Sequence, residues 1–116
     1  MLTITATILT LTLLHALTAW ARPPLTPAQL RAYVYRTDAC LAQIVDHENG
    51  LWIATRYGIG GSYGLPQAQP GSKMRSAGPD WATNPWTQLR WARGYARGRY
   101  GSTCAAWAFW RAHRWW

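Results

Sequence analysis

The feature that most constrains the fold is a glycine- and proline-rich segment in the middle of the chain. Residues 50–80 hold seven glycines and three prolines, with few aliphatic side chains. Glycine and proline interrupt helices and strands, so the segment predicts a long irregular or hairpin-like loop. A loop of this length in a compact domain is usually functional or disordered. The aromatic anchors Trp52, Tyr57 and Tyr63 favour an ordered, functional loop.

Helix start and stop signals flank this loop on both sides. Thr26-Pro27 and Asn84-Pro85 each pair an N-cap residue with proline at the first helical position, and Asp38 is a further N-cap. Gly50 and Gly101 are stop signals. The predicted helices cover residues 27–35, 39–49, 85–99 and 103–110. We therefore expect one small, mainly α domain without internal repeats.

Glu48 falls on the apolar face of the second predicted helix. Leu41, Ile44 and Val45 precede it by seven, four and three residues, so all four side chains share one face, while Asp46 points elsewhere. Burial raises the pKa of a carboxyl group, and a general acid near neutral pH requires such a group. The alternative is a structural acid at the helix end that pairs with an arginine.

The third predicted helix carries two stripes of different character. The spacing predicts a buried stripe of Leu89, Ala92, Ala96 and Tyr100. It also predicts a basic stripe, interpreted as a solvated face, of Arg90, Arg93 and Arg97. Gly94 inside this helix predicts the close packing of a neighbouring element.

The N-terminal segment predicts export. Residues 2–19 are apolar or threonine, interrupted only by His15, and Ala19-Trp20-Ala21 fits an A-x-A cleavage signal. We expect residues 1–21 to form a signal peptide and the protein to be secreted, with a lead-in and first helix over 22–37. No Lys or Arg precedes the apolar run, so a retained membrane anchor is the alternative.

The two cysteines of the chain bear on its stability. A secreted protein would oxidise Cys40 and Cys104, whereas two buried free thiols are the alternative. A disulfide would help a domain too short for a large core. Two cysteines do not make a zinc site, and His47 and His113 lack finger-like spacing, so we expect no metal.

The formal net charge of +8 favours anionic partners. Nucleic acid, anionic lipid and bacterial wall polymers all qualify, but a secretion signal argues against nucleic acid. Eight tryptophans follow the predicted signal peptide, too many for a core of this size, so some must lie at the surface. The Arg/Trp-rich stretch 107–116 predicts core and surface aromatics, with insertion at a membrane interface as the alternative.

Four motifs together resemble a known family. They are Cys40-Leu-Ala-Gln-Ile-Val-Asp-His-Glu-Asn-Gly50, Tyr63-Gly-Leu-Pro-Gln-Ala-Gln-Pro-Gly-Ser-Lys-Met74, Asn84-Pro85 and Tyr100-Gly-Ser-Thr-Cys-Ala-Ala-Trp107. In this order they resemble the secreted transglycosylase-like domains of the lysozyme-like superfamily, which occur in bacterial wall-associated and phage proteins. The resemblance implies a small lysozyme-like domain over residues 38–116, with the Gly-rich loop or a short hairpin lining a cleft.

The resemblance also implies an activity. Members of this family cleave the β-1,4 bond between N-acetylmuramic acid (MurNAc) and N-acetylglucosamine (GlcNAc) in peptidoglycan. It implies a monomer at the cell wall, without a cofactor and without stable membrane insertion after cleavage of the signal peptide, and with peptidoglycan and other anionic wall polymers as its partners.

Site residues follow from the positions that match. Glu48 matches the catalytic acid, and Cys40 and Cys104 match a disulfide pair. The implied substrate-binding residues are Asn49, Ser62, Tyr63, Gly64, Leu65 and Gln67. Asn49 stands where the family commonly has serine, and it can still donate a hydrogen bond. Gln67 as a loop brace and Tyr63 as a packing residue are the alternatives.

The number of acids bears on the mechanism. Glycoside cleavage usually uses two carboxylates, and the sequence offers no clear partner for Glu48. A single-acid lytic transglycosylase reaction therefore fits best, and Asp80 would permit hydrolysis if it reached the cleft. The family often ends in Tyr-Asn with an active-site tyrosine, whereas residues 107–116 contain no tyrosine. A non-catalytic wall-binding module and a cationic membrane-active protein are therefore two further candidate functions.

Overall fold

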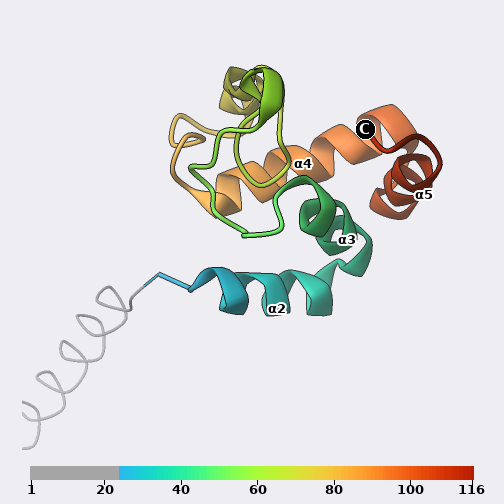
Figure 1. Ribbon diagram of the computed structural model, residues 1–116, viewed down its shortest axis with the longest axis horizontal. Helices are drawn as coiled ribbons and strands as arrows, with labels where there is room; N and C mark the ends of the chain where they lie inside the picture. Colours follow the sequence, from blue (N-terminus) through green and yellow to red (C-terminus); the bar gives the residue numbers. More distant parts are fainter. Residues whose placement is uncertain (1–23) are drawn as a thin grey trace, which may run out of the picture.

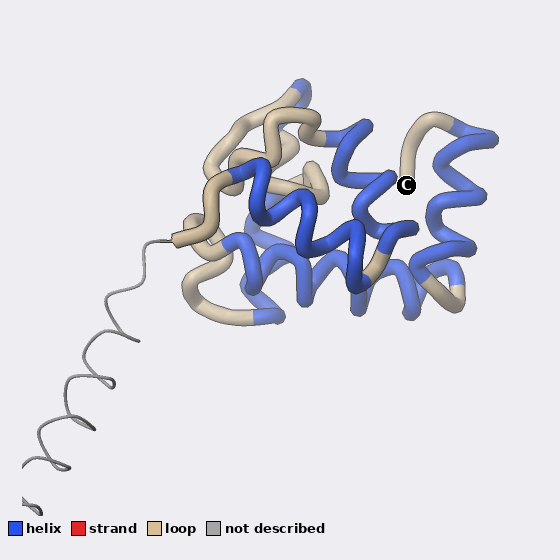
Figure 2. The backbone as a smooth tube through the Cα atoms, turned by 90° about the horizontal axis from the view of Figure 1, so that it is seen from below, coloured by secondary structure: helices blue, strands red, loops and turns tan. Residues whose placement is uncertain are grey.

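The computed structural model describes residues 24–116 of the protein (Figure 1). This part of the chain consists of helices and loops, with two isolated β-bridges and no strand (Figure 2). The prediction of a mainly α fold is therefore confirmed. The predicted signal peptide, residues 1–21, lies outside the described residues. None of the helices described is both long and apolar enough to span a lipid bilayer.

Four α-helices and two short 3-10 helices make up the described chain. In order they are α2 (Pro27–Thr37), α3 (Ala39–Glu48), η1 (Ile59–Gly61), η2 (Gly71–Ala77), α4 (Pro85–Tyr100) and α5 (Thr103–His113). Helix α3 packs on α2 and on α5, and α4 packs on α5 and on η2. In Figure 1 the loop lies at the N-terminal end of α4, and α5 lies at its C-terminal end.

The first two helices begin where the cap signals predict. The Thr26 hydroxyl accepts from the backbone N–H of Gln29, whose side chain in turn accepts from the N–H of Thr26, which makes a complete capping box. Asp38 ends α2 and caps α3 through a hydrogen bond from the N–H of Leu41. Helix α3 ends at Glu48, one residue before the predicted end at Asn49.

The last two helices also follow their signals at the start. Asn84 caps α4, Gly101 ends it with φ +95°, and Ser102 caps α5. Helix α5 continues three residues beyond its predicted end, to His113. Arg114 then adopts a left-handed conformation with φ +66°, which turns the chain back toward α4.

The core joins the two predicted apolar stripes. Leu41, Ile44 and Val45 of α3 and Leu89, Ala92 and Ala96 of α4 are all buried. Leu30 and Val34 of α2 belong to the same core cluster as Leu41, so the first helix shares the core of the domain. The aliphatic spacing of the sequence therefore predicted the buried faces correctly.

A disulfide and a carboxylate tie the helices together. Cys40 of α3 and Cys104 of α5 form the expected disulfide, across 64 residues of sequence. Closing a loop of this length stabilises a domain by about 4 kcal/mol on the chain-entropy account. Next to it, Asp38 accepts hydrogen bonds from the hydroxyl of Thr103 and the guanidinium of Arg93. The carboxylate of Asp38 thus links α3, α4 and α5.

Two predictions for α4 need correction. Arg93 is half-buried in its ion pair with Asp38, so only Arg90 and Arg97 of the basic stripe are exposed. Gly94 is exposed, and a Cβ atom built on it would meet nothing within 4 Å. Within residues 24–116 no element packs closely on this glycine, because it lies on the face of α4 away from the core.

The central loop is held by side-chain amides in place of strands. Only single bridges, Tyr57 to Tyr63 and Tyr63 to Ala68, join its segments. The buried amide of Gln88 in α4 accepts from the N–H of Leu65 and donates to the carbonyls of Ala54 and Trp81. Three separate loop segments thus meet on one side chain, which satisfies backbone groups that a sheet would otherwise pair.

Candidate active site

Glu48, the last residue of α3, lies where two cavities meet. The larger cavity has a volume of about 350 Å³ and the smaller one about 290 Å³, and Glu48, Ser62 and Gln67 line both. Arg56, Gly58 and Ile59 complete the smaller cavity, on the side of the loop. We call the two cavities together the Glu48 cleft.

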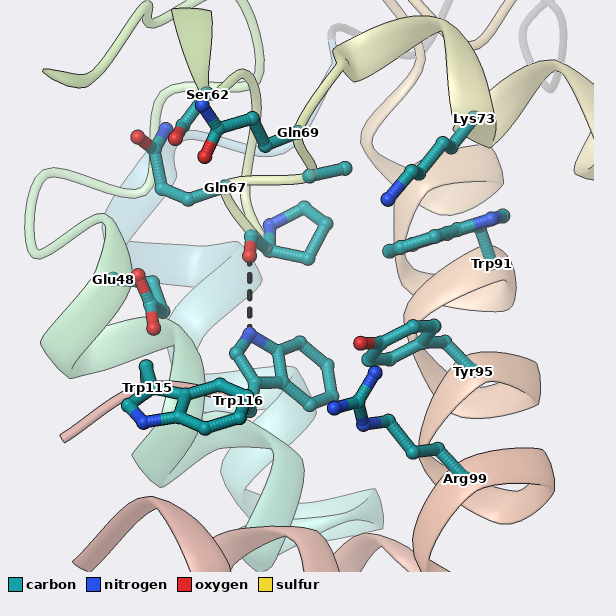
Figure 3. Close-up of a pocket in the computed structure, with 12 residues that line it drawn as sticks. Glu48, Ser62, Gln67, Gln69, Lys73, Trp91, Tyr95, Arg99, Trp115 and Trp116 are labelled. Atoms are coloured by element: carbon teal, nitrogen blue, oxygen red, sulfur yellow. Dashed lines mark hydrogen bonds between the residues drawn. The ribbon is translucent and has the colours of Figure 1, made fainter. Parts of the chain in front are cut away.

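The larger cavity is bounded by α3, the loop, η2, α4 and the segment after α5. The residues that line it are Glu48, Ser62, Pro66, Gln67, Ala68, Gln69, Lys73, Trp91, Tyr95, Arg99, Trp115 and Trp116. Figure 3 shows Glu48 on one wall and Lys73, Trp91, Tyr95 and Arg99 on the opposite wall. Trp91 and Tyr95 stack with their ring centroids 4.9 Å apart. The cleft therefore combines one acid, flat aromatic rings and basic groups.

One oxygen of the Glu48 carboxyl group is anchored from α5. The indole Nε1 of Trp110 donates to Oε1 over 2.8 Å. Within residues 24–116 no hydrogen bond reaches the second oxygen, Oε2. Burial raises the pKa of Glu48 above its usual value, and this influence exceeds those of the Trp110 hydrogen bond and the charge of His47, which lower it. One oxygen is thus fixed while the group retains its proton more strongly than an exposed glutamate does.

Trp110 is itself held in place by other aromatic rings. Only 7% of its surface is exposed. The ring centroids of His47 and Trp110 are 4.5 Å apart. Trp107 stacks on Trp110, with the ring centroids 5.6 Å apart. A buried indole needs a partner for its N–H group, and Glu48 supplies it. The packing of α5 against α3 therefore fixes the orientation of the acid.

The two carboxyl groups near the end of α3 have opposite environments. Asp46 accepts hydrogen bonds from Arg31, Tyr35 and Trp52. Its partial burial raises the pKa, but these hydrogen bonds together lower it below the usual value. Asp46 is thus held ionised toward α2, whereas Glu48 is biased to the protonated form toward α5, as their positions on different helix faces predict.

Asp80 does not line the Glu48 cleft. Its carboxylate accepts from Asn84 Nδ2 at 2.8 Å and from Thr87 Oγ1 at 2.7 Å, at the start of α4. These hydrogen bonds lower its pKa. It lines a different cavity, beside Leu30 and Trp86. Among the described residues that line the cleft, Glu48 has the one side-chain carboxyl group.

Ser62 and Gln67, two of the predicted substrate-binding residues, line both cavities. The Ser62 hydroxyl donates to the carbonyl of Ile59. Gln67 has φ +52°, an uncommon conformation for a residue with a side chain, and its Nε2 donates to the carbonyl of Gly64 at 2.9 Å. Gln67 therefore braces the loop while it lines the cleft, and its contact with substrate stays a prediction.

Tyr63, Gly64 and Leu65 line neither cavity. Tyr63 is buried in a cluster with Ala68 and Met74 and donates its hydroxyl to the carbonyl of Ala82. Leu65 is fully buried in the main core cluster. These three residues anchor the loop behind the wall of the cleft, through hydrogen bonds to Ala82, Asn49 and Gln88.

Asn49 also lies behind the cleft. It is fully buried, and its Nδ2 donates to the carbonyls of Ile53 at 2.8 Å and Gly64 at 3.0 Å. Both hydrogens of the amide are therefore engaged, and none is left for a ligand. Asn49 is a positioning residue that fixes the loop against the end of α3.

The predicted site residues did not include several residues that line the cleft. Trp91, Tyr95 and Arg99 recur at intervals of four, which places them on one face of α4, beside the buried stripe and opposite the basic stripe. This third stripe was visible in the sequence. That it faces Glu48 was not visible, because it depends on how α3 and α4 pack. Lys73 of η2 had no local signal of this kind.

The stretch 107–116, which covers most of α5 and the three residues after it, was predicted to add core and surface aromatics, and it does both. Trp115 is half exposed, whereas Trp116 packs against the core clusters and donates its indole N–H to the carbonyl of Pro66 at 3.2 Å. Its ring meets Tyr95 edge-on, with the centroids 5.3 Å apart. The turn at Arg114 thus brings both indoles into the larger cavity.

Among the residues described, no cluster of three or more His, Cys, Asp or Glu side chains could hold a metal ion. In comparisons with known proteins, no family model, no curated protein and no solved structure matches this chain. The inference of function therefore rests on the Glu48 cleft and on the motifs of the sequence.

Proposed function

We propose that the protein cleaves the glycan strands of peptidoglycan at the MurNAc–GlcNAc β-1,4 bond, as a lytic transglycosylase with Glu48 as its acid and base. The observation that carries the proposal is the position of this group. A half-buried carboxyl group with a raised pKa lies where two cavities meet, and within residues 24–116 no other side-chain carboxyl group lines them. The resemblance of the motifs around Glu48 supports the same activity.

The arrangement of the cleft suits a polymer cut within its length. Such a substrate has to be held on both sides of the bond that breaks, since positioning contributes a large part of catalysis. Cavity space extends from Glu48 toward Arg56 in one direction and toward Trp91 and Tyr95 in the other. Amphipathic rings suit the flat faces of sugars. The two cavities would take the sugars on either side of the bond.

The reaction requires two proton transfers by the same group. Protonated Glu48 gives its proton to the glycosidic oxygen as the bond from this oxygen to C1 of MurNAc breaks. The Glu48 carboxylate then takes the proton of the C6 hydroxyl, and O6 bonds to C1. The products are a new GlcNAc 4-hydroxyl end and a 1,6-anhydro-MurNAc end. No water is consumed, and Glu48 is again protonated.

A single carboxyl group is sufficient for this sequence of steps. Hydrolysis by two carboxylates requires the second group within about 10 Å, across the sugar. Asp80, the candidate for that role, is bonded to Asn84 and Thr87 outside the cleft. Glycosidases in which the substrate replaces the second carboxylate are known. The raised pKa supports the first step, because it keeps the acid protonated closer to neutral pH.

The test is mass spectrometry of the soluble products after incubation of the purified protein with peptidoglycan. We expect anhydro-muropeptides from the unmodified protein and from Asp80→Asn, and a rate lower by about 10²- to 10⁴-fold in Glu48→Gln. Circular dichroism confirms that the variants are folded. Products with reducing ends that disappear in Asp80→Asn would instead establish hydrolysis.

Glycan binding without cleavage is the second candidate. The observation that favours it is the position of Trp115 and Trp116, which form part of the wall of the cavity beside Glu48 and offer flat rings to a sugar, with Trp116 hydrogen-bonded to Pro66. If peptidoglycan is bound equally by the unmodified protein and by Glu48→Gln, and neither releases products, the enzyme proposal fails and the binding role stands.

A further inference from the structure

Basic residues face Glu48 across the cleft. Lys73 of η2 and Arg99 of α4 line the larger cavity, and Figure 3 shows both side chains directed into it from the wall opposite Glu48. Arg56 adds a third cation in the smaller cavity. The ion pairs of the described chain, Arg31 with Asp46 and Arg93 with Asp38, lie elsewhere. Among the side chains that line the cleft, three cations therefore face one carboxyl group, that of Glu48.

Arg99 is exposed and lies beside three aromatic rings. Its guanidinium carbon lies 5.9 Å from the ring centre of Tyr95 and 5.6 Å from those of Tyr100 and Trp115. Such cation–π contacts fix the position of the group without using its N–H donors. In the described part of the chain Arg99 makes no ion pair. Its guanidinium lies beside the Tyr100 hydroxyl, whose pKa it lowers against the larger effect of burial. A planar fork of five N–H donors retains enough of them to bind a carboxylate through two hydrogen bonds.

A carboxylate is also what distinguishes the two sugars of peptidoglycan. GlcNAc is neutral, whereas MurNAc carries a lactyl group that ends either in a free carboxylate or in a stem peptide with carboxylates of its own. A cleft that had to accept only GlcNAc would gain nothing from unpaired cations. The cations opposite Glu48 would therefore favour a glycan that contains MurNAc over one that contains only GlcNAc.

We propose that Arg99, assisted by Lys73, recognises a carboxylate carried by the MurNAc residue and so determines specificity for peptidoglycan over neutral glycans. The assignment of the carboxylate to MurNAc rests on the proposed function. The assignment of the two cations as an anion site rests on their position in the cleft.

Binding to the Glu48→Gln variant tests this inference without cleavage. Trp91, Trp115 and Trp116 line the cavity, so their fluorescence reports occupancy. The probes are three tetrasaccharides: (GlcNAc–MurNAc)₂ with free lactyl groups, the same glycan with stem peptides, and the neutral tetramer of GlcNAc. We expect at least one acidic probe to bind about tenfold or more tightly than the neutral probe, since charge-assisted hydrogen bonds contribute about 1.5–3 kcal/mol.

Added substitutions identify the side chains responsible. We expect Arg99→Gln to weaken the acidic probe about tenfold and the neutral probe less than about twofold. Lys73→Gln should give a smaller loss of the same kind. Arg99→Lys, which retains the charge but not the fork, should be intermediate. The matched control is Arg97→Gln, two residues away on α4 and outside the cavity, with the same change in net charge and no selective loss.

The outcomes separate the sources of the carboxylate and the two proposals. Tight binding of the peptide-free probe identifies the lactyl carboxylate, and tight binding of only the peptide-bearing probe identifies the stem peptide. Equal binding of neutral and acidic probes, or equal losses in Arg97→Gln and Arg99→Gln, overturns the inference. If peptidoglycan is cleaved but acidic probes bind no more tightly than the neutral probe, the proposed function stands and this inference fails. If acidic probes bind more tightly but peptidoglycan is not cleaved, the anion site stands and the proposed function fails.

Discussion

The indole nitrogen of Trp110 lies 2.8 Å from Oε1 of Glu48, and this hydrogen bond joins α5 to the end of α3. It lowers the pKa of the carboxyl group, against burial, which is the larger influence and raises it. The acid at the centre of the cleft is therefore adjusted from a helix 62 residues further along the chain.

Removal of this donor should move the pH dependence of activity. Trp110→Phe retains an aromatic ring but no N–H group, so the pKa of Glu48 rises further. A general acid is active while it is protonated, so the rate of peptidoglycan cleavage should decline at higher pH than in the unmodified protein. Trp107→Phe is the control, because Trp107 stacks on Trp110 but does not bond to Glu48. A decline that stays in place, or moves to lower pH, would contradict this account.

Glu48→Gln should change stability in a pH-dependent manner. The pKa of Glu48 is raised in the folded protein, so its contribution is fully present below the pKa of the unfolded chain and is lost as pH rises through the raised value. Glutamine does not ionise, so the stability of the variant does not decrease in this way as pH rises. Its free energy of unfolding, measured with urea at several pH values, should therefore gain on that of the unmodified protein as pH rises above the ordinary range of glutamate.

Asp46→Asn should show the opposite dependence. The lowered pKa of Asp46 means that its contribution is present above the pKa of the unfolded chain and is lost as pH falls through the folded value. We expect the substitution to cost about 1–3 kcal/mol at neutral pH, and less in acid, because it weakens bonds from Arg31, Tyr35 and Trp52. A cost independent of pH would show that the carboxylate charge is not involved.

Gly64→Ala should destabilise the loop more than Gly61→Ala does. Both glycines have positive φ, +78° and +81°, so both substitutions carry a similar conformational cost of about 1–2 kcal/mol. At Gly64 the new Cβ would also lie 2.6 Å from Oε1 of Gln88, whereas at Gly61 nothing lies within 4 Å. Overpacking should add about 1–3 kcal/mol at Gly64, measured by urea unfolding. Equal losses would mean that Gln88 can move aside at no cost.

Tyr100→Phe should leave stability unchanged or increase it by up to about 1 kcal/mol, since a buried polar group without a partner is unfavourable. The Tyr100 hydroxyl is buried and has no hydrogen-bond partner in the described chain. The control is Tyr63→Phe, whose hydroxyl donates to the carbonyl of Ala82 and whose loss should cost about 1 kcal/mol. Thermal unfolding of both variants compares them, and a clear loss in Tyr100→Phe would indicate an interaction of its hydroxyl.

Local signals predicted the helices and the buried position of Glu48. Caps at Thr26, Asp38 and Asn84 and the stop at Gly101 lie where the sequence indicated them. These signals act over a few residues, which is why they can be read from a single sequence. The spacing of the apolar residues before Glu48 correctly predicted its helix face for the same reason, since all of these residues belong to α3.

The composition of the cleft could not be predicted in this way. Gln88 gives no local sign that it holds three loop segments, and Tyr63 and Leu65, which match the motif of a cleft wall, face the core. Arg99 meets the space opposite Glu48 only because α3 and α4 pack around a common core. Such relationships depend on tertiary packing between residues that are far apart in the sequence, and no local sequence pattern indicates them.

The buried amide of Asn49 also bears on how the protein ages. Asn49 precedes Gly50, and asparagine followed by glycine is the pair most prone to spontaneous deamidation, one reason why asparagine counts as thermolabile. Its amide is bonded to Ile53 and Gly64, and its backbone is held at the end of α3. Each unfolding event releases that restraint. Deamidation would then leave a carboxylate facing two carbonyl oxygens, so damage acquired while unfolded would prevent the loop beside Glu48 from closing again.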